Sequence, residues 1–266
     1  MAINSYDVPT LTVLLSPERL GALTNLTRSA ETAIDLHQAT LRLGVALMNV
    51  IATIEIALRN SISENLSHYF AVPNWLQQPP VALRWKEQER KKIALTIDTA
   101  RRAEYSKLSQ ADKAKLETLA YPKGRPPNTS HLKRAKDRQR YIPVTEGKVI
   151  AELTFYFWKR LYGPEYEQAL WRPSLKRTFP DKKLSRASVA IQLEHLYQAR
   201  NRLAHHEPVL HRRFVDTMAA VEFITQRLGV TAPSPHTPLA NLLTEDIADV
   251  QTREGELRAR LDSFRV

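Results

Sequence analysis

Cysteine is absent from this 266-residue sequence, and glycine is scarce at 7 residues. Without thiols the chain has no disulfide framework, no cysteine-ligated zinc or iron–sulfur site and no thiol nucleophile, so a reducing compartment is expected. The N-terminus also lacks a basic flank followed by a long apolar run, which argues against a secretory signal. The most apolar stretch, residues 43–58, carries Asn49 and Glu55 and falls short of a membrane-spanning length. These absences predict a cytoplasmic protein without membrane association.

Acidic residues are the minority: the sequence has 28 Asp and Glu and 39 Lys and Arg, which gives a net charge of +11. The excess is concentrated from Arg84 to Arg140, where 17 basic residues stand against 7 acidic ones. Such a field favours a polyanion, and we expect these cations to contact nucleic acid: Lys91, Lys92, Arg101, Arg102, Lys133, Arg134 and Lys136. Four aromatic residues among them are suited to stack on unpaired bases: Trp85, Tyr105, Tyr121 and Tyr141. A solvated surface insertion is the alternative.

Strand signals are lacking as well, and helical periodicity dominates the chain. Ser16 is the expected N-cap of the first helix, with Pro17 in its first turn. The last helix has an apolar heptad seam that Glu254 interrupts, which favours packing on the chain's own body over a dimer contact. The predicted helices cover residues 16–29, 33–70, 91–103, 109–119, 145–163, 184–204, 209–228 and 240–264.

The fold class that follows is all-α. We expect one helical body over residues 1–235 and a C-terminal helix within 236–266. The body would hold N-terminal helices, a basic helical insertion at about 84–141 and a motif region at 184–215.

One residue breaks the apolar pattern of the predicted helix 184–204. An apolar stripe runs from Val189 to Leu203 with spacings of four, three, four and three, and Arg200 stands within it. A guanidinium in an apolar seam is costly unless it is paired or faces a partner or ligand. Pro208 must end the helix, which places the pair His205–His206 in its last turn.

An arginine and a histidine aimed at one cleft are sufficient for metal-free phosphodiester cleavage. The base takes the proton of the 2′-hydroxyl, the arginine stabilises charge on phosphorus, and an acid protonates the leaving 5′-oxygen. Two other interpretations stay open at this point. The histidines could interact with the helix dipole, or His205, His206 and His211 could bind zinc with partners from elsewhere. The His-Glu-x-x-His metalloprotease motif is absent, because His211 lies one residue too far from His206.

Residues 200–205, Arg-Asn-Arg-Leu-Ala-His, are similar to the Arg-x4-His motif of the HEPN ribonuclease superfamily. The wider sequence resembles the Abi-like (abortive infection) branch of that superfamily over most of residues 15–215. The segments that carry this resemblance follow one another in order: LSPERL, TIEIALRNSISENL, NWL, VIAELTFYFWKRLYGPEYEQALW, LKRTFP and LYQARNRLAHHEPVL. Tyr156 departs from it, since the family usually has glycine there. Glu207 stands where some HEPN toxins have a tyrosine that a partner enzyme modifies.

The resemblance implies a HEPN-type helical bundle and a metal-independent endoribonuclease that needs no cofactor. Its substrate would be RNA, in abortive infection or a toxin–antitoxin system, and an antitoxin RNA or protein could restrain it. Two Arg/His motifs would face each other in a homodimer. His205 carries over as the general acid or base with His206 as the alternative, Arg200 as the phosphate-binding residue, and Asn201 as an orienting residue.

Five further residues are expected to support this site: Glu55, Arg59, Asn60, Arg202 and Glu207. Glu55 and Arg59 stand four apart on one helix face and could simply pair with each other. Arg202 is expected to point toward solvent and substrate, and Glu207 to cap the following helix. A non-catalytic RNA-binding scaffold and a regulatory subunit are the alternative functions.

Overall fold

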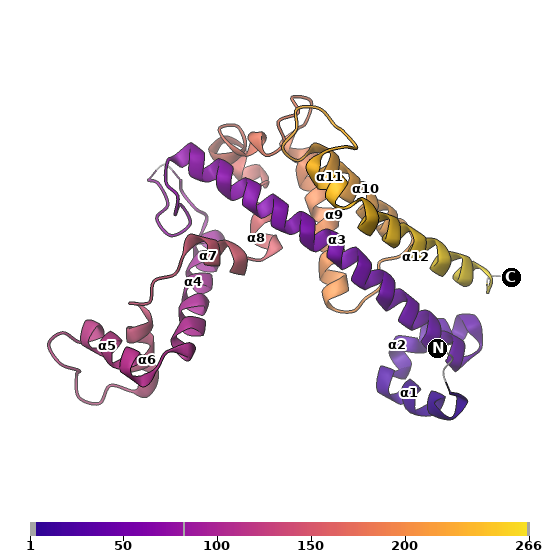
Figure 1. Ribbon diagram of the computed structural model, residues 1–266, viewed down its shortest axis with the longest axis horizontal. Coiled ribbons are helices and arrows are strands. Elements are labelled where there is room, and N and C mark those ends of the chain that lie inside the picture. The colour runs from indigo at the N-terminus through magenta and orange to yellow at the C-terminus, as the bar shows by residue number, and fades with distance from the viewer. Residues whose placement is uncertain (1–3, 82, 265–266) are drawn as a thin grey trace. The chain divides into compact units, whose positions relative to one another are not determined.

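The computed structural model describes residues 4–81 and 83–264, and in these ranges the regular secondary structure is helical, without a β-strand. The all-α prediction is therefore confirmed (Figure 1). The chain forms two compact units: unit 1 comprises Met1–Ala57 and Phe179–Val266, and unit 2 comprises Leu58–Thr178. The boundary expected near residue 235 does not appear in this division, because the C-terminal helices belong to unit 1.

Helix α3 (Ala30–Phe70) contributes residues to both units. It extends well beyond the apolar stretch 43–58 and is long and apolar enough to cross a membrane by length and composition alone. The core helix of a soluble protein meets the same criterion, and one face of α3 is fully buried in the protein. The side chains on this face are Leu43, Leu47, Val50, Ile51, Ile54, Leu58 and Ile62.

Unit 1 combines the first part of α3 with helices from both ends of the chain. As expected, Ser16 caps its second α-helix, and its hydroxyl oxygen accepts a hydrogen bond from the Arg19 amide at 3.3 Å. The other elements of unit 1 are η1 (Ser5–Asp7), α1 (Val8–Leu15), α2 (Pro17–Thr27), α9 (Arg186–Ala204), α10 (Arg212–Arg227), α11 (Pro238–Leu242) and α12 (Thr244–Asp262).

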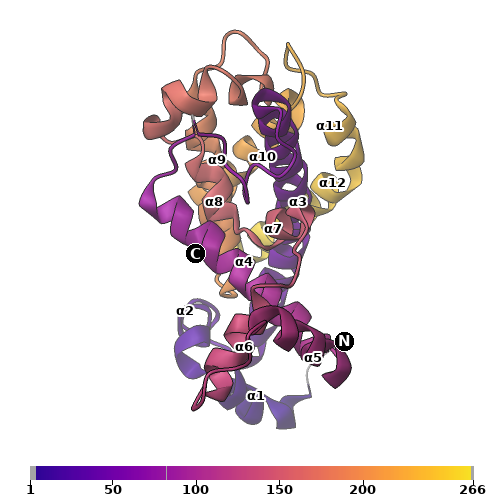
Figure 2. The same cartoon turned by 90° about the vertical axis from the view of Figure 1, so that its left-hand side faces the viewer.

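Helix α12 runs beside α3 in both views (Figures 1 and 2). Its seam residues Val250 and Leu257 are buried. The Asn49 amide donates to the Asp246 carboxylate at 3.1 Å, and near the other end of α12 Arg260 pairs with Asp35. The last helix thus packs on the chain's own body through an antiparallel contact with α3.

Unit 2 holds the basic part of the sequence. It contains the last part of α3 and the elements α4 (Glu87–Lys107), α5 (Gln110–Ala120), α6 (His131–Gln139), α7 (Glu146–Glu152), α8 (Phe155–Arg160), η2 (Pro164–Tyr166), the π-helical turn η3 (Glu167–Trp171) and η4 (Leu175–Arg177).

The helix predicted over residues 145–163 is divided into α7 and α8. Leu153 and Thr154 between them have extended backbone angles. The Ala151 carbonyl, near the end of α7, accepts a hydrogen bond from Arg59 Nη1 at 3.4 Å. A carbonyl at a helix end needs such a partner because no following turn supplies an amide. The hydrogen bond between Arg59 and Ala151, which lie far apart in the sequence, therefore stabilises the break between α7 and α8. The apolar periodicity of the sequence does not predict this break.

An aromatic cluster forms part of the core of unit 2. The Trp85 ring lies 5.8 Å from Trp75, 5.9 Å from Phe157 and 6.1 Å from Tyr166 between centroids. Trp85 is only 7% exposed. The expectation that this side chain stacks on bases is wrong, because an indole placed among other aromatic rings serves the core.

Candidate functional site

The motif residues lie where α9 ends. The Glu207 amide donates to the Arg202 carbonyl at 2.8 Å, and the His206 amide donates to the Leu203 carbonyl at 3.0 Å. This pair of bonds is a Schellman motif, with His205 as the C-cap and His206 in the left-handed position at φ 57°. The two neighbouring histidines therefore have different backbone roles.

A residue of α2 braces this helix end. Arg19 Nη1 donates to the carbonyl of His206 at 3.2 Å. Glycine is the usual occupant of a left-handed helix end, since a Cβ atom there is strained. The contact from Arg19 joins α2 to the end of α9 at His206, the residue whose backbone carries that strain. Composition and spacing gave no signal for this role of Arg19.

Arg200 lies at the edge of the apolar seam, and Ala199 takes the buried position next to it. The side chain of Arg200 is 39% exposed, and its Nε lies 3.9 Å from Oε2 of Glu55 on α3. Glu55 itself is only 14% exposed. Pairing thus compensates the arginine in the seam, and Glu55 is the supporting residue that the structure brings to it.

The side chains of His205 and His206 are both exposed, while Asn201 is half-buried. His211 is the N-cap residue of α10 and adopts another strained backbone conformation, with φ 54° and ψ −131°. In the described ranges no group of three or more His, Asp or Glu side chains is placed to hold a metal ion.

An apolar groove of about 430 Å³ borders the motif between α3 and the end of α9. The helices approach closely at Gly44, where an added Cβ would lie 3.2 Å from a methyl carbon of Leu203. Val45 on the groove is 73% exposed, which is unusual for a valine in a long core helix. The residues of the groove used below are Leu41, Gly44, Val45, Met48, Leu203 and His206.

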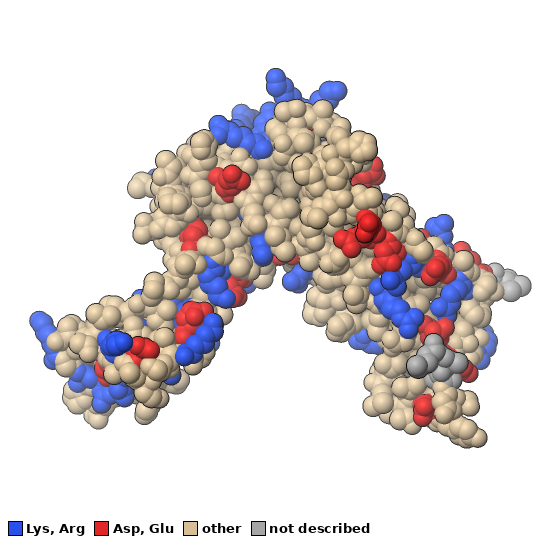
Figure 3. All heavy atoms as spheres, in the orientation of Figure 1, with Lys and Arg blue, Asp and Glu red and all other residues tan. Residues whose placement is uncertain are grey.

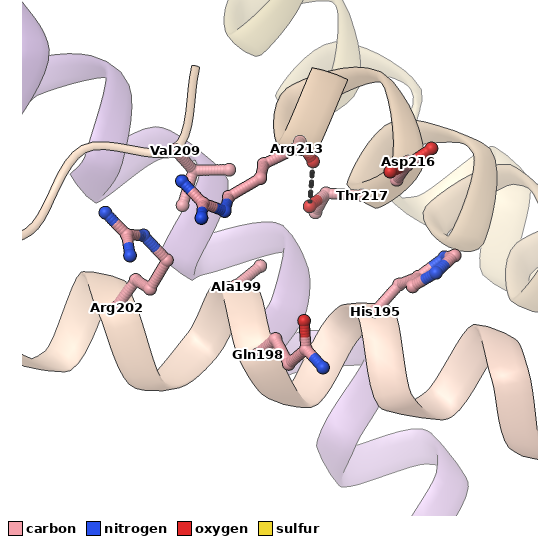
Figure 4. Close-up of a pocket in the computed structure, with 8 residues that line it drawn as sticks. All are labelled: His195, Gln198, Ala199, Arg202, Val209, Arg213, Asp216 and Thr217. Atoms are coloured by element: carbon pink, nitrogen blue, oxygen red, sulfur yellow. Dashed lines mark hydrogen bonds between the residues drawn. The ribbon is translucent and has the colours of Figure 1, made fainter. Parts of the chain in front are cut away.

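A smaller hollow of about 40 Å³ lies between α9 and α10 (Figure 4). The guanidinium groups of Arg202 and Arg213 lie on one side of it near Val209, and His195 lies toward its other end beside Asp216. Arg202 pairs with Glu207 at 3.0 Å. The prediction that Glu207 caps the following helix is wrong, because the N-cap of α10 is His211. Within the described part of the chain the guanidinium of Arg213 has no ion-pair partner. Sequence reasoning missed Arg213 because only the pairing of the two helices brings it to the motif.

Arg59 and Asn60 belong to unit 2. Asn60 is exposed, whereas Arg59 bonds to the Ala151 carbonyl that ends α7. Arg59 therefore has a defined structural role within its own unit. Its predicted part in orienting the motif remains a prediction.

The predicted nucleic-acid contacts lie on α4 and α6. Figure 3 shows Lys and Arg side chains gathered over α5 and α6, at the lower left. Lys91, Arg102, Lys133 and Lys136 are exposed, and Lys92 and Arg101 are half-buried. Lys91 also forms an exposed ion pair with Glu87 at 2.6 Å.

Three arginines of this basic region surround one carboxylate. Glu117 on α5 pairs with Arg125 at 3.4 Å, with Arg134 at 2.8 Å and with the buried Arg138. Burial opposes ionisation of Glu117, but the hydrogen bonds from Arg134 and Arg138 outweigh it and hold its pKa below the ordinary value. Glu117 thus partly compensates the charge of Arg134 within the protein.

Two predicted stacking residues also have partners within unit 2. The Tyr121 hydroxyl donates to Asp137 at 2.8 Å. The Tyr105 hydroxyl accepts from Arg138 at 3.1 Å. Tyr141 is the most open of the four aromatic residues, with 48% of its surface exposed.

A comparison with protein families finds one matching model, described as Abi-like protein, over residues 17–211. No curated protein and no solved structure matches the chain. The matched residues run from the start of α2 to the N-cap of α10, and so include Glu55, Arg200 and both histidines of the motif. Because the match spans well over half of the sequence, the chain belongs to the Abi-like protein family, which suggests a part in abortive infection, a defence against phage.

Proposed function

We propose that the protein is a metal-independent endoribonuclease of the HEPN type, and that it acts in phage defence. The observation that carries this proposal is the pairing of Arg200 with Glu55 beside an exposed helix end that presents His205. Neither Arg200 nor His205 serves the apolar core of unit 1, since both side chains remain accessible.

The partly exposed Arg200 is suited to bind a phosphate. The 3.9 Å between its Nε and the Glu55 carboxylate is beyond hydrogen-bond distance, so Glu55 attracts the guanidinium electrostatically without occupying its donors. A guanidinium binds phosphate oxygens in a bidentate manner and stabilises the negative charge that accumulates in the transition state.

His205 would transfer the protons. A base removes the proton of the 2′-hydroxyl as its oxygen attacks phosphorus, and an acid gives a proton to the 5′-oxygen as the P–O5′ bond breaks. The products are a 2′,3′-cyclic phosphate and a 5′-hydroxyl. One histidine cannot be base and acid in the same step, which favours a homodimer whose second copy supplies the other.

Arg202 and Arg213 would assist by attracting the RNA backbone to the hollow next to the motif. Two guanidinium groups on one side of a small hollow repel each other, and only Arg202 has a carboxylate partner there. A phosphate of the substrate would relieve this repulsion.

The test compares wild type with Arg200→Ala and His205→Ala, each incubated with total RNA in EDTA. Each substitution is expected to slow cleavage by about 100-fold or more, the usual contribution of a general acid or base for His205 and of a group that stabilises transition-state charge for Arg200. The matched control is His236→Ala, because His236 is an exposed histidine in a loop of the same unit. Equal cleavage by all four proteins, or loss of wild-type cleavage in EDTA, would contradict the proposal.

A non-catalytic RNA-binding protein is the second candidate, and the basic surplus between residues 84 and 140 favours it. It would bind RNA tightly and lose affinity steeply with salt. Binding without any cyclic-phosphate product in the same experiment would select this candidate.

A further inference from the structure

Unit 2 contains a hollow of about 310 Å³ between α4 and α8. This volume is within the range of small-molecule sites. Apolar and cationic side chains line it together, and those that matter for its chemistry are Gln88, Lys91, Lys92, Leu95, Tyr156 and Phe157.

The inner surface of this hollow is apolar. Phe157 is buried in the core and the Tyr156 ring borders the space beside it. Leu95 is 59% exposed, although the helix that carries it is otherwise rich in charge. A flat aromatic or heteroaromatic group would cover this apolar surface and remove it from water.

Hydrogen bonds hold the aromatic wall in position. Gln88 Nε2 donates to the Tyr156 hydroxyl at 3.0 Å, and Lys159 Nζ lies 5.3 Å from the centroid of the Tyr156 ring. Beneath it, the buried Glu89 accepts from Arg160 at 2.6 Å and from the Tyr166 hydroxyl at 2.8 Å. Arg160 also pairs with Glu165 at 2.6 Å, so carboxylates already compensate its charge.

The uncompensated charge of the hollow is on its rim. Lys92 has no ion-pair partner among residues 4–81 and 83–264, and the exposed Lys91 shares its charge with Glu87 alone. An apolar wall with ammonium groups at its edge complements a base joined to a phosphate. It does not suit an acidic peptide, which offers no flat ring for the wall.

We propose that this hollow binds one unpaired nucleotide of an RNA chain. The base stacks against Tyr156 and covers Leu95, while Lys92 and Lys91 contact the adjoining phosphate. A base paired within a duplex cannot enter, because both of its faces are already stacked. The inference rests on the proposed function in one respect, which is that RNA is the ligand.

The experiment measures the affinity of full-length protein for a fluorescein-labelled 12-nucleotide oligouridylate and for a blunt RNA duplex by anisotropy, with EDTA present. All proteins carry His205→Ala so that the RNA stays intact. Tyr156→Ala and Lys92→Ala are expected to weaken single-strand binding at least five-fold, a change at the low end of stacking contributions. Duplex binding should change less than two-fold.

Two control variants distinguish the loss of pocket contacts from general effects of substitution or of lost positive charge. Tyr156→Phe keeps the ring and should bind within two-fold of its parent. Lys176→Ala removes one exposed charge elsewhere in unit 2 and should also have little effect. A thermal melt of each variant shows whether it is folded, and Lys92→Ala still tests the pocket if Tyr156→Ala unfolds.

The pocket proposal is overturned if Tyr156→Ala and Lys92→Ala bind oligouridylate as tightly as the parent, or if the parent does not bind it. Cleavage that depends on Arg200 would then still support the proposed function. Conversely, binding that depends on Tyr156 without any cleavage by the protein with intact His205 would leave the pocket standing and contradict the nuclease.

Discussion

His206 occupies a backbone conformation that usually belongs to glycine, and this separates it from the neighbouring His205. A histidine with φ 57° at the end of α9 costs about 1 kcal/mol relative to an unstrained position. The sequence alone left open which histidine transfers the proton. The structure gives His206 the strained left-handed position and His205 the unstrained C-cap position, while both side chains are exposed; the assignment of proton transfer to His205 stays a prediction.

The different backbone roles of His205 and His206 predict different effects of substitution. His206→Gly removes the strain but loosens the unfolded chain, so the free energy of unfolding should stay within about 1 kcal/mol of wild type. Its RNA cleavage should be within about three-fold of wild type, whereas His205→Ala should lose about 100-fold. Denaturant melts and a cleavage assay check both parts. Loss of cleavage in His206→Gly with retention in His205→Ala would reverse the assignment.

Arg200 and Trp85 show which contacts the sequence predicts and which it does not. The spacing of the apolar stripe placed Arg200 within it, whereas the structure places Arg200 at its edge, with Nε 3.9 Å from the carboxylate of Glu55; the roles predicted for both residues stay predictions. The spacing could not reveal that Ala199 takes the buried position, because one residue of rotation on a helix changes which neighbour faces the core. Trp85 was misassigned for a similar reason, since charged neighbours in sequence do not show what a side chain contacts in space.

At the scale of elements, α6 shows the limit of periodicity. Its sequence, His131–Gln139, is dominated by charge, and no helix was predicted there. Two of its arginines pair with Glu117 of α5, so a contact between helices stabilises it. By contrast, α3, α9 and α10 carry regular apolar faces and were predicted within a few residues. The break between α7 and α8 was missed because Arg59 comes from a different helix.

Glu117 makes the α5–α6 pair sensitive to acid. Its pKa is lower in the folded protein than in the unfolded chain, so it stabilises the fold above the unfolded value of about 4.3. This stabilisation disappears as the pH falls through the lower, folded value. Amide hydrogen exchange of α5 and α6, corrected for intrinsic rates, should therefore become faster as the pH falls from 7 below the folded pKa of Glu117.

The substitution Glu117→Gln should produce the same acceleration at pH 7, because it leaves Arg134 and Arg138 without their carboxylate. Glu104→Gln is the control, since Glu104 forms an exposed pair with Lys107 that contributes little. If α5 and α6 exchange at the wild-type rate in Glu117→Gln, the carboxylate does not hold this pair of helices together.

At the scale of the whole molecule, the proposed nuclease chemistry favours two copies of the chain, because one histidine cannot be base and acid in the same step. The groove beside His206 offers an apolar surface next to the motif, with Val45 strongly exposed. Burial of such a surface between two copies would place the two helix ends close to each other. We propose this groove as the contact between the two copies.

The substitution Val45→Asp tests this dimer. A carboxylate in an apolar interface should raise the dissociation constant at least ten-fold, about 1.4 kcal/mol. Light scattering at low micromolar protein should then report the monomer mass, and RNA cleavage should fall with the dimer fraction. Val81→Asp changes a valine that is even more exposed in unit 2 and should leave the mass unchanged. A dimeric Val45→Asp protein would exclude this groove as the interface.

Family membership and the helical fold were thus predictable from the ordered motifs and the periodicity, whereas the division into two units was not. Domain boundaries are usually sought in linkers rich in proline, glycine and polar residues. Here one boundary falls between Ala57 and Leu58, in the middle of the most regular apolar pattern of the sequence. Composition gives no sign of it.

Because α3 contributes residues to both units, the two units cannot be separated without cutting this helix. A chain cut between Ala57 and Leu58 would leave two half-helices, each with unpaired backbone groups and an apolar stripe that has lost its continuation. We therefore expect that neither unit folds on its own. We expect a protein domain to be tolerated when it is inserted in a loop such as residues 121–130, and not when it interrupts α3.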